Sequence, residues 1–223
     1  MNIKNYYNSE ASQKAYVGKT GLMSSEEAIF SFISKNSTIL DLGCGGGRTT
    51  IELHKKGFHD IIGIDFAENL ILGAKNKFPE IKEKFMVGDA TNLHEFSDNQ
   101  FDVVFFSFNG IDYIPDRKSR LMAFFEIFRV LKSGGFFIFS SHNRYCLPIN
   151  RNLLKTQMRN IFNISSEYWL TRQSFGDVST YYSSEKGLEK DLVDIGFHKK
   201  LVVPNVPFLY PFFDTFPYYI FQK

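Results

Sequence analysis

The stretch Ile39-Leu-Asp-Leu-Gly-Cys-Gly-Gly-Gly-Arg48 contains the pattern that decides the fold. Apolar residues surround Asp41, glycines then follow at alternate positions, and a helical pattern begins at Thr49. This order predicts a strand, a tight turn and a helix. Glycine at such a turn lets the backbone approach a ligand where a Cβ atom would collide, and the helix start presents free N–H groups.

Asp41 places a carboxylate at the end of the predicted strand, beside the glycine turn. That charge would repel a pyrophosphate group and attract a ligand that carries an ammonium or sulfonium group. We therefore expect a small cationic cofactor at this turn instead of a dinucleotide.

The composition is typical of a globular protein with one full core. The chain has 223 residues, of which 43% are hydrophobic, and a formal net charge of +2, too small to indicate a nucleic-acid partner. The N-terminus lacks a signal-peptide pattern, and there is no apolar run of about 18 residues. Two cysteines form no disulfide framework. We expect a cytoplasmic protein without a membrane span, either a monomer or a homodimer.

Strand and helix patterns alternate along most of the chain. Short apolar runs predict buried strands at 38–42, 61–65, 85–87, 101–106 and 136–140. Helical patterns separate most of them, at 48–56, 67–77 and 117–131, and a capping box of Ser24 and Glu27 starts an earlier helix. This alternation predicts an α/β fold with a doubly wound, mostly parallel sheet.

The C-terminal part predicts how that sheet ends. A helix at 184–195 is followed by two strands, 201–203 and 218–221, with a proline-rich loop and no helix between them. This arrangement predicts an antiparallel last strand in a seven-stranded sheet. We expect one domain, 1–223, with lid-forming residues at 1–34 and a substrate cap inserted after the fifth strand at 142–182.

Three acids, Asp41, Asp65 and Asp89, end three successive predicted strands. In open α/β sheets, ligands bind beyond the carboxyl ends of the strands. Asp65 follows Gly45 by 20 residues, an offset that suits a carboxylate accepting both ribose hydroxyls.

The neighbouring residues suit a nucleoside. Asp89 can accept a hydrogen bond from the exocyclic amine of adenine, and Phe66 can cover one face of the base. The alternatives are structural: Asp65 as a helix cap alone, and Asp89 as a cap for a turn with Asn92.

These motifs together resemble the class I S-adenosylmethionine-dependent methyltransferases that act on small molecules. The matching segments are Ile39-Leu-Asp-Leu-Gly-Cys-Gly-Gly-Gly, Gly63-Ile-Asp65, Gly88-Asp89-Ala90, Phe101-Asp-Val-Val and Glu126-Ile-Phe-Arg-Val-Leu-Lys-Ser-Gly-Gly-Phe-Phe. The similarity covers about 38–142 and resumes at 181–221. It implies a Rossmann-like sheet, S-adenosyl-L-methionine as methyl donor and S-adenosyl-L-homocysteine as product.

The resemblance also implies a set of cofactor contacts. Gly43, Cys44 and Gly45 would face the methionine part, Asp65 the ribose, and Asp89 with Ala90 the adenine. Ser107 or Phe108 would lie near the sulfonium. Tyr7 and Tyr16 match no fixed motif, but they would close an N-terminal lid over the cofactor.

The reaction would be an in-line attack of an acceptor atom on the methyl group. Alignment and exclusion of water supply most of the catalysis, and a general base helps where the acceptor is protonated. His142, just past the fifth predicted strand, is the best-placed base, because the ordinary pKa of histidine is about 6.5. Asp112 and Tyr113 are the other candidates. A hydrogen-bonded loop role for His142, and a reaction without a base, both stay open.

The predicted insert at 142–182 is basic and aromatic, and this composition indicates which acceptors could bind there. Between 142 and 172, five basic residues stand against Glu167 alone. This pattern favours a small acceptor with a carboxylate, phosphate or sugar ring, although a solvated basic face is an equal alternative. We expect methyl transfer to an oxygen or nitrogen atom. The candidate acceptor contacts are Asn109, Arg144, Arg159, Trp169 and Tyr181.

Several function classes lack their motifs. No Asn-Pro-Pro-Tyr or paired glutamates follow the fourth predicted strand, Cys146 has no preceding proline, and no cluster has metal-ligand spacing. An NAD(P)-dependent oxidoreductase is the main rival, disfavoured because Arg48 replaces the third glycine of Gly-x-Gly-x-x-Gly. A catalytically silent nucleoside-binding module also stays open.

Overall fold

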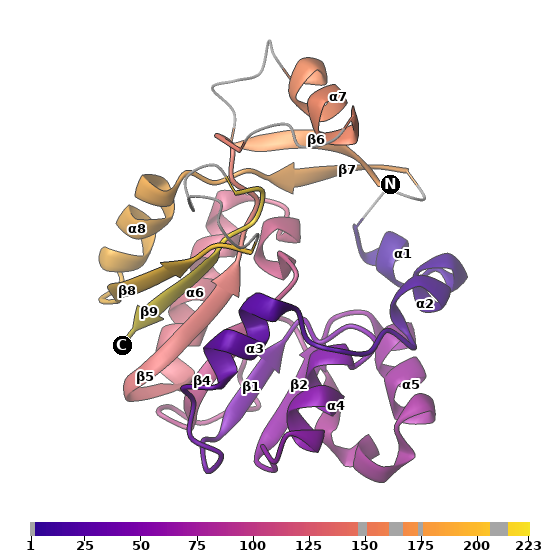
Figure 1. Cartoon of the computed structure of the whole chain (residues 1–223), viewed down its shortest axis with the longest axis vertical. Helices are drawn as coiled ribbons and strands as arrows, with labels where there is room; N and C mark the ends of the chain where they lie inside the picture. Colours follow the sequence, from indigo (N-terminus) through magenta and orange to yellow (C-terminus); the bar gives the residue numbers. More distant parts are fainter. Residues whose placement is uncertain (1–2, 147–150, 161–166, 174–175, 206–213) are drawn as a thin grey trace.

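The computed structural model describes residues 3–146, 151–160, 167–173, 176–205 and 214–223. A seven-stranded sheet runs through the centre, and its strands follow the order β3-β2-β1-β4-β5-β9-β8 (Figure 1). Strands β1 to β5 pair in parallel, whereas β9 pairs antiparallel with both β5 and β8. The predicted α/β class, the doubly wound sheet and the antiparallel last strand are confirmed. The strands are β1 Ile39–Leu42, β2 Ile61–Asp65, β3 Phe85–Val87, β4 Phe101–Phe106, β5 Leu131–Ser140, β8 His198–Val203 and β9 Tyr218–Gln222.

Helices cover both faces of the sheet. Alternate strand residues point to opposite faces, so Leu40 and Val104 pack with α6 and α8, while Ile39 and Val103 pack with α3 and α4. Both faces are therefore closed to water, as expected for a parallel sheet. The helices are α3 Ser24–Phe30, α4 Arg48–Lys55, α5 Glu68–Lys77, α6 Arg117–Val130 and α8 Glu185–Val193.

The predicted capping box at the start of α3 is wrong by one residue. The helix already includes Ser24, and the Met23 backbone N–H donates to the Glu26 carboxylate at 2.7 Å. Glu26 is drawn to this position because Arg48 and Ser107, far along the chain, also donate to it. A local sequence pattern gives no information about those distant partners.

Two regions without a clear sequence pattern fold next to the sheet. The N-terminal residues form α1 Ile3–Tyr7 and α2 Glu10–Tyr16, which lie beside α5 (Figure 1). The insert after β5 forms α7 Arg151–Arg159 and an antiparallel hairpin of β6 Tyr168–Gln173 and β7 Gly176–Tyr181. Two short 3-10 helices, η1 Pro79–Lys84 and η2 Gly110–Tyr113, follow α5 and β4. Within the described ranges, no helix is long and apolar enough to cross a membrane.

Candidate active site

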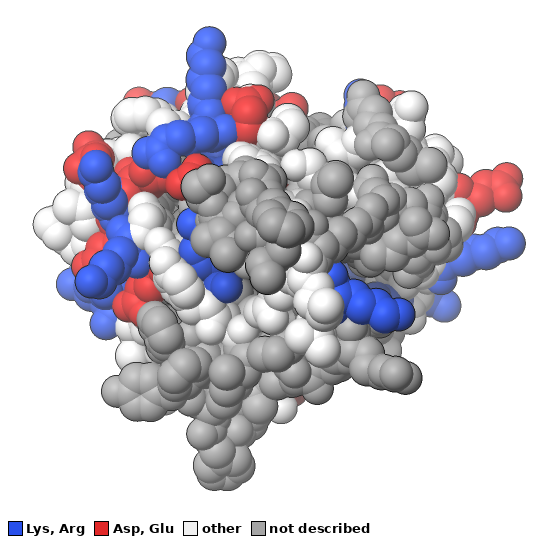
Figure 2. Space-filling view, turned by 90° about the horizontal axis from the view of Figure 1, so that it is seen from above, with Lys and Arg blue, Asp and Glu red and all other residues white. Residues whose placement is uncertain are grey.

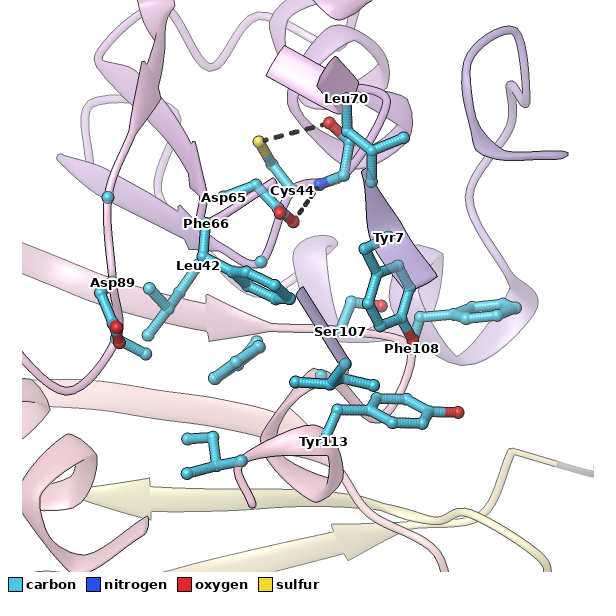
Figure 3. A pocket seen from close by; sticks show the side chains of 18 of the residues that line it. Tyr7, Leu42, Cys44, Asp65, Phe66, Leu70, Asp89, Ser107, Phe108 and Tyr113 are labelled. Carbon is cyan, nitrogen blue, oxygen red and sulfur yellow. Dashed lines mark hydrogen bonds between the residues drawn. The ribbon is translucent and has the colours of Figure 1, made fainter. Parts of the chain in front are cut away.

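A cavity of about 350 Å³ lies beyond the carboxyl ends of β1, β2 and β4 (Figure 3). The strand order changes direction between β1 and β4, which is where open α/β sheets bind ligands. All but one of the cofactor residues expected from the sequence line this cavity. They are Tyr7, Tyr16, Gly43, Cys44, Gly45, Asp65, Phe66, Asp89, Ala90, Ser107 and Phe108.

The glycine turn presents bare backbone to the cavity. Gly43 and Gly45 have φ angles of 69° and 55°, in the left-handed region that favours glycine. The Gly45 N–H donates to Asp65 Oδ2 at 2.9 Å, which ties the turn to the end of β2. The turn and the carboxylate are therefore held in one fixed arrangement.

Asp65 is both a helix cap and part of the cavity wall. Its Oδ1 accepts from the Ala67 N–H at 2.8 Å, at the start of α5. Burial raises the pKa of Asp65 to about 6, although the two backbone hydrogen bonds act in the opposite direction. The carboxylate is ionised at neutral pH and retains lone pairs for two further donors, such as a pair of hydroxyls.

Asp89 and Phe66 line the same side of the cavity. Asp89 is exposed, and its Oδ1 accepts from both the backbone N–H and the hydroxyl of Thr91. These bonds fix the carboxylate without using Oδ2. Asp89 also forms the expected turn with Asn92, whose N–H donates to the Asp89 carbonyl oxygen at 2.9 Å. The Phe66 ring projects into the cavity between Asp65 and Tyr7 (Figure 3).

Asp41 does not line the cavity. It is only 1% exposed, and its carboxylate accepts from the hydroxyls of Thr49 and Thr50 in the first turn of α4. Burial raises the pKa of Asp41 to about 6, against the effect of those two hydrogen bonds. The structure therefore brings Asp65 and Asp89 to the cavity, whereas the buried Asp41 stabilises the first turn of α4.

Aromatic rings surround the cavity on the side of the N-terminal helices. The centroid of the Tyr7 ring lies 5.8 Å from Tyr16, 5.8 Å from Phe66 and 5.6 Å from Tyr113. Burial raises the pKa of Tyr7, Tyr16 and Tyr113, so these hydroxyls stay neutral at physiological pH. The rings form an apolar wall whose polar groups carry no charge.

The loop after β4 holds Phe108 against this wall. Phe108 and Asn109 have φ angles of 54° and 61°, a conformation that costs residues other than glycine about 1–3 kcal/mol. The Lys19 Nζ lies 4.8 Å from the centroid of Tyr16 and 5.2 Å from that of Phe108. Lys19 thus connects the end of the N-terminal helices to the loop after β4.

A buried ionic cluster that the sequence did not reveal lies beside the cavity. Arg48, at the start of α4, forms two 2.7 Å hydrogen bonds with the Glu26 carboxylate, and Ser107 and Tyr218 donate to the same Glu26 oxygen. Burial would raise the pKa of Glu26, but the hydrogen bonds and charge of Arg48 hold it below its usual value. The cluster joins α3, α4, β4 and β9. Arg48 and Ser107 also line the cavity.

Asp112 and His142 form a pair next to the cavity. Asp112 Oδ2 lies 2.7 Å from His142 Nδ1 and accepts from the His142 backbone N–H at 2.6 Å, while Ser141 donates to Oδ1. Neither residue of the pair lines the cavity, but Tyr113 does. The Tyr113 ring packs edge-on against His142, with 6.4 Å between the centroids.

Four of the five expected acceptor contacts, Asn109, Arg144, Trp169 and Tyr181, lie outside the cavity lining. Trp169 stacks on Tyr182 at 4.5 Å, and the Arg144 guanidinium lies 5.9 Å from the Trp169 ring. Tyr181 is buried against the guanidinium of Arg120, 3.4 Å from its ring centroid. Asn109 is also buried, and its backbone N–H donates to Ser140 Oγ. The side chain of Arg159 lies outside the described residues.

The end of the molecule that carries the insert was expected to be basic. Figure 2 looks down on this end, where Asp, Glu and uncharged residues lie among the described Lys and Arg side chains. The described part of this face therefore shows no continuous basic surface. Among the described residues, no group of three His, Cys, Asp or Glu side chains could hold a metal ion.

Comparison with known proteins shows which family this chain resembles. A family model described as a methyltransferase domain matches residues 39–135. The chain is 41% identical over 105 residues to demethylmenaquinone methyltransferase of Leptospira interrogans, which is 45% of this chain and 41% of that enzyme. It is 30% identical over 177 residues to the Staphylococcus aureus enzyme of the same name, covering 74% of this chain and 69% of that one.

The chain belongs to the class I S-adenosylmethionine-dependent methyltransferases. Solved structures share the fold of this methyltransferase. A methyltransferase of Methanosarcina mazei superimposes with a TM-score of 0.71 at 24% identity, over 88% of this chain and 96% of that one. A methyltransferase of Clostridium acetobutylicum gives 0.66 at 19% identity, over 89% of each chain. The chain spans less than half the length of its Leptospira relative.

The methyl donor of the family, S-adenosylmethionine, fits the groups that this cavity presents. The left-handed backbone at Gly45 leaves open space, since a Cβ there would meet only Leu70 Cδ1, at 4.0 Å, whereas a Cβ on Gly43 would collide with the Phe106 ring at 2.5 Å. The carboxylates of Asp65 and Asp89 can accept from the ribose hydroxyls and the adenine amine. A volume of about 350 Å³ also falls within the range of small-molecule sites.

Proposed function

We propose that this methyltransferase transfers the methyl group of S-adenosylmethionine to an oxygen or nitrogen atom of a small molecule by in-line displacement. The single observation that supports this most is the convergence of the glycine turn, Asp65, Asp89 and the tyrosine wall on one cavity. The bound cofactor supplies a methyl group that is already electrophilic, so the chain has to bind, orient and exclude water.

The residues on the nucleoside side would hold the cofactor. Asp65 would accept from the ribose hydroxyls, and Asp89 with Ala90 would face the adenine, whose ring would pack against Phe66. Gly43, Cys44 and Gly45 would face the methionine part. Ser107 and Phe108, at the end of β4, would then lie near the sulfonium. This assignment uses every lining carboxylate.

The residues on the other side would position the acceptor. Tyr7, Tyr16 and Tyr113 line the cavity with half-buried rings, which would exclude water from the point of transfer. Because Asp112 accepts at His142 Nδ1, we assign the proton to that nitrogen, which leaves Nε2 as the base for the acceptor proton. Asp112 is then the positioning residue of the pair, and Tyr113 links it to the cavity.

The acceptor class follows from the wall around the transfer point. The tyrosine rings and Ile3 favour a flat or apolar body, while Lys4 and Lys19 favour a carboxylate or phosphate group on it. The Leptospira and Staphylococcus relatives are named for demethylmenaquinone. Methylation of a quinone-like ring is therefore the second candidate function. The insert at 142–182 would cover the acceptor in either case.

Two measurements test this function. Calorimetric titration should show micromolar binding of S-adenosylmethionine and no binding of NAD(H) or NADP(H); the reverse result would establish an oxidoreductase. Incubation with S-adenosylmethionine labelled in its methyl group and a metabolite pool should give a labelled small molecule. NMR of the product then identifies the acceptor atom. Binding without turnover of any acceptor would establish a silent binding module instead.

A further inference from the structure

Two glycines are not explained by their own backbone conformation. Gly46 lies within the glycine turn and Gly73 in the middle of α5, and neither has a positive φ angle. Glycine inside a helix is less favourable than alanine. Both positions therefore need another reason to lack a side chain.

The reason is the same for both glycines: two consecutive residues of the N-terminal segment (residues 3–17) occupy the space. A Cβ atom on Gly46 would lie 2.5 Å from the carbonyl oxygen of Tyr16. A Cβ atom on Gly73 would lie 2.5 Å from Cγ2 of Val17. Real Cβ atoms do not approach other atoms this closely, so each glycine opens room for the end of α2.

Polar contacts hold the same segment on α5, one turn before Gly73. The Asn69 backbone N–H donates to Asn8 Oδ1 at 3.1 Å, and the Asn69 side chain donates to the Asn8 carbonyl oxygen at 2.6 Å. Gln13 donates to the Asn69 carbonyl oxygen at 2.9 Å. Asn69 and Gly73 are four residues apart, so they share one face of the helix. That face receives the N-terminal segment.

We propose that Gly46 and Gly73 are positioning residues for methyl transfer. Their missing side chains let the N-terminal segment settle against the glycine turn and α5, which sets Tyr7 and Tyr16 over the cavity. This inference rests on the proposed function, because those tyrosines act only where a cofactor is bound. A side chain at either position lifts the segment, and the fraction of molecules ready to enclose the cofactor falls.

Gly73→Ala is the sharper variant, because Gly73 does not line the cavity and alanine favours the helix. We expect Gly73→Ala to weaken S-adenosylmethionine binding by at least about fivefold, the size of a typical overpacking effect. We also expect trypsin to cleave faster after Lys14 and Lys19. Asn76→Ala, at an exposed position of the same helix, is the matched control and should change neither readout.

A second substitution separates positioning from general damage. Val17→Ala removes both Cγ2 and Cγ1, which a Cβ on residue 73 would meet at 2.5 Å and 3.3 Å, and leaves Val17 Cβ at 3.4 Å, an ordinary contact. The double variant Val17→Ala with Gly73→Ala should therefore regain most of the affinity and of the protection from trypsin. Gly46→Ala meets backbone atoms of Tyr16, so Val17→Ala should not rescue it.

The two proposals fail in different ways. If the wild-type chain binds no S-adenosylmethionine, the proposed function is wrong, and the trypsin rates alone decide whether Gly73 receives the segment. If the wild type binds the cofactor and Gly73→Ala binds it equally well, with unchanged cleavage after Lys14 and Lys19, the positioning role is overturned. Loss of binding that Val17→Ala does not restore would overturn it as well.

Discussion

The cofactor side and the acceptor side of the cavity are built in different ways. On the cofactor side, the groups that follow the strands lie at a strand end or within three residues after it, such as Gly43 after β1, Asp65 at the end of β2 and Ser107 after β4. On the acceptor side, the groups come from segments far apart in sequence. Asp112 and His142 are 30 residues apart, and Tyr7 reaches Tyr113 from the N-terminal helices.

This difference indicates what each side controls. The parallel register of β1 with β2 and β4 fixes the relative positions of the cofactor groups before any side chain packs. The acceptor groups depend on hydrogen bonds and ring contacts between separate elements. Substitutions on the cofactor side should therefore change cofactor affinity, whereas those at Asp112 and His142, which do not line the cavity, should change turnover and leave that affinity alone.

The largest expected effect lies on the acceptor side. His142→Gln should lower kcat by about 10²–10⁴-fold, the usual contribution of a general base. Binding of S-adenosylmethionine, measured by calorimetry, should stay within about twofold because His142 does not line the cavity. Asp112→Asn should behave similarly, since it removes the acceptor at Nδ1. His94→Gln, at an exposed histidine, is the control. Unchanged turnover in His142→Gln would make the pair structural.

The same contrast explains how much could be predicted from the sequence. The strand ends and the glycine turn follow a local pattern, so the doubly wound sheet and its antiparallel last strand could be predicted. The expected cofactor residues, other than Asp41, line the cavity, whereas the expected acceptor contacts in the described residues do not. The carboxylate of Asp41 accepts hydrogen bonds from the hydroxyls of Thr49 and Thr50, in the first turn of the next helix. The position of Asp41 at a strand end does not by itself predict those partners.

Contacts between residues far apart in the chain could not be predicted from the sequence. The N-terminal helices have no clear apolar period, because they are held by contacts such as those of Asn8 with Asn69. The cluster of Glu26, Arg48 and Tyr218 joins residues up to 192 positions apart. The position of Arg48 after the glycine turn was the only available signal, and it carried no information about its partner.

The second prediction concerns the buried ionic cluster around Glu26, which joins α3 and α4 to β4 and β9. Glu26→Gln leaves the guanidinium of Arg48 buried without its counter-charge, so the free energy of unfolding should fall by about 3 kcal/mol. Urea denaturation measures the change. Glu27→Gln is the matched control, because Glu27 pairs with Lys56 in solvent and such pairs contribute about 0–1 kcal/mol. Equal effects at the two positions would contradict the role of the cluster.

The third prediction uses pH to separate stability from cofactor affinity. Burial raises the pKa of Asp41 and Asp65 to about 6, so the folded state binds protons that the unfolded state releases between pH 6 and the ordinary value near 3.8. These two acids should therefore make the free protein more stable as the pH falls from 7.5 to 5. Urea denaturation at both pH values measures this.

Cofactor affinity should change in the opposite direction. The ribose contact needs an ionised Asp65, so the Kd for S-adenosylmethionine should rise by up to about tenfold per pH unit below pH 6. Calorimetry across this range, with Asp65→Asn for comparison, isolates the contribution of that carboxylate. Asp41→Asn should keep the pH dependence of the affinity, because Asp41 does not line the cavity. An affinity that is flat from pH 7.5 to 5 would rule out the proposed ribose contact.

The smallest expected effect lies where the two sides meet. Lys19 joins the N-terminal segment to the loop after β4 through the rings of Tyr16 and Phe108. Exposed cation–ring contacts contribute about 0.5–1 kcal/mol, so Lys19→Ala should weaken cofactor binding by about two- to fivefold. Lys19→Met keeps the aliphatic chain and removes the charge. Equal losses in both variants would assign the effect to charge, whereas binding retained in Lys19→Met would assign it to packing. Lys14→Ala, which removes a nearby positive charge from α2, is the control.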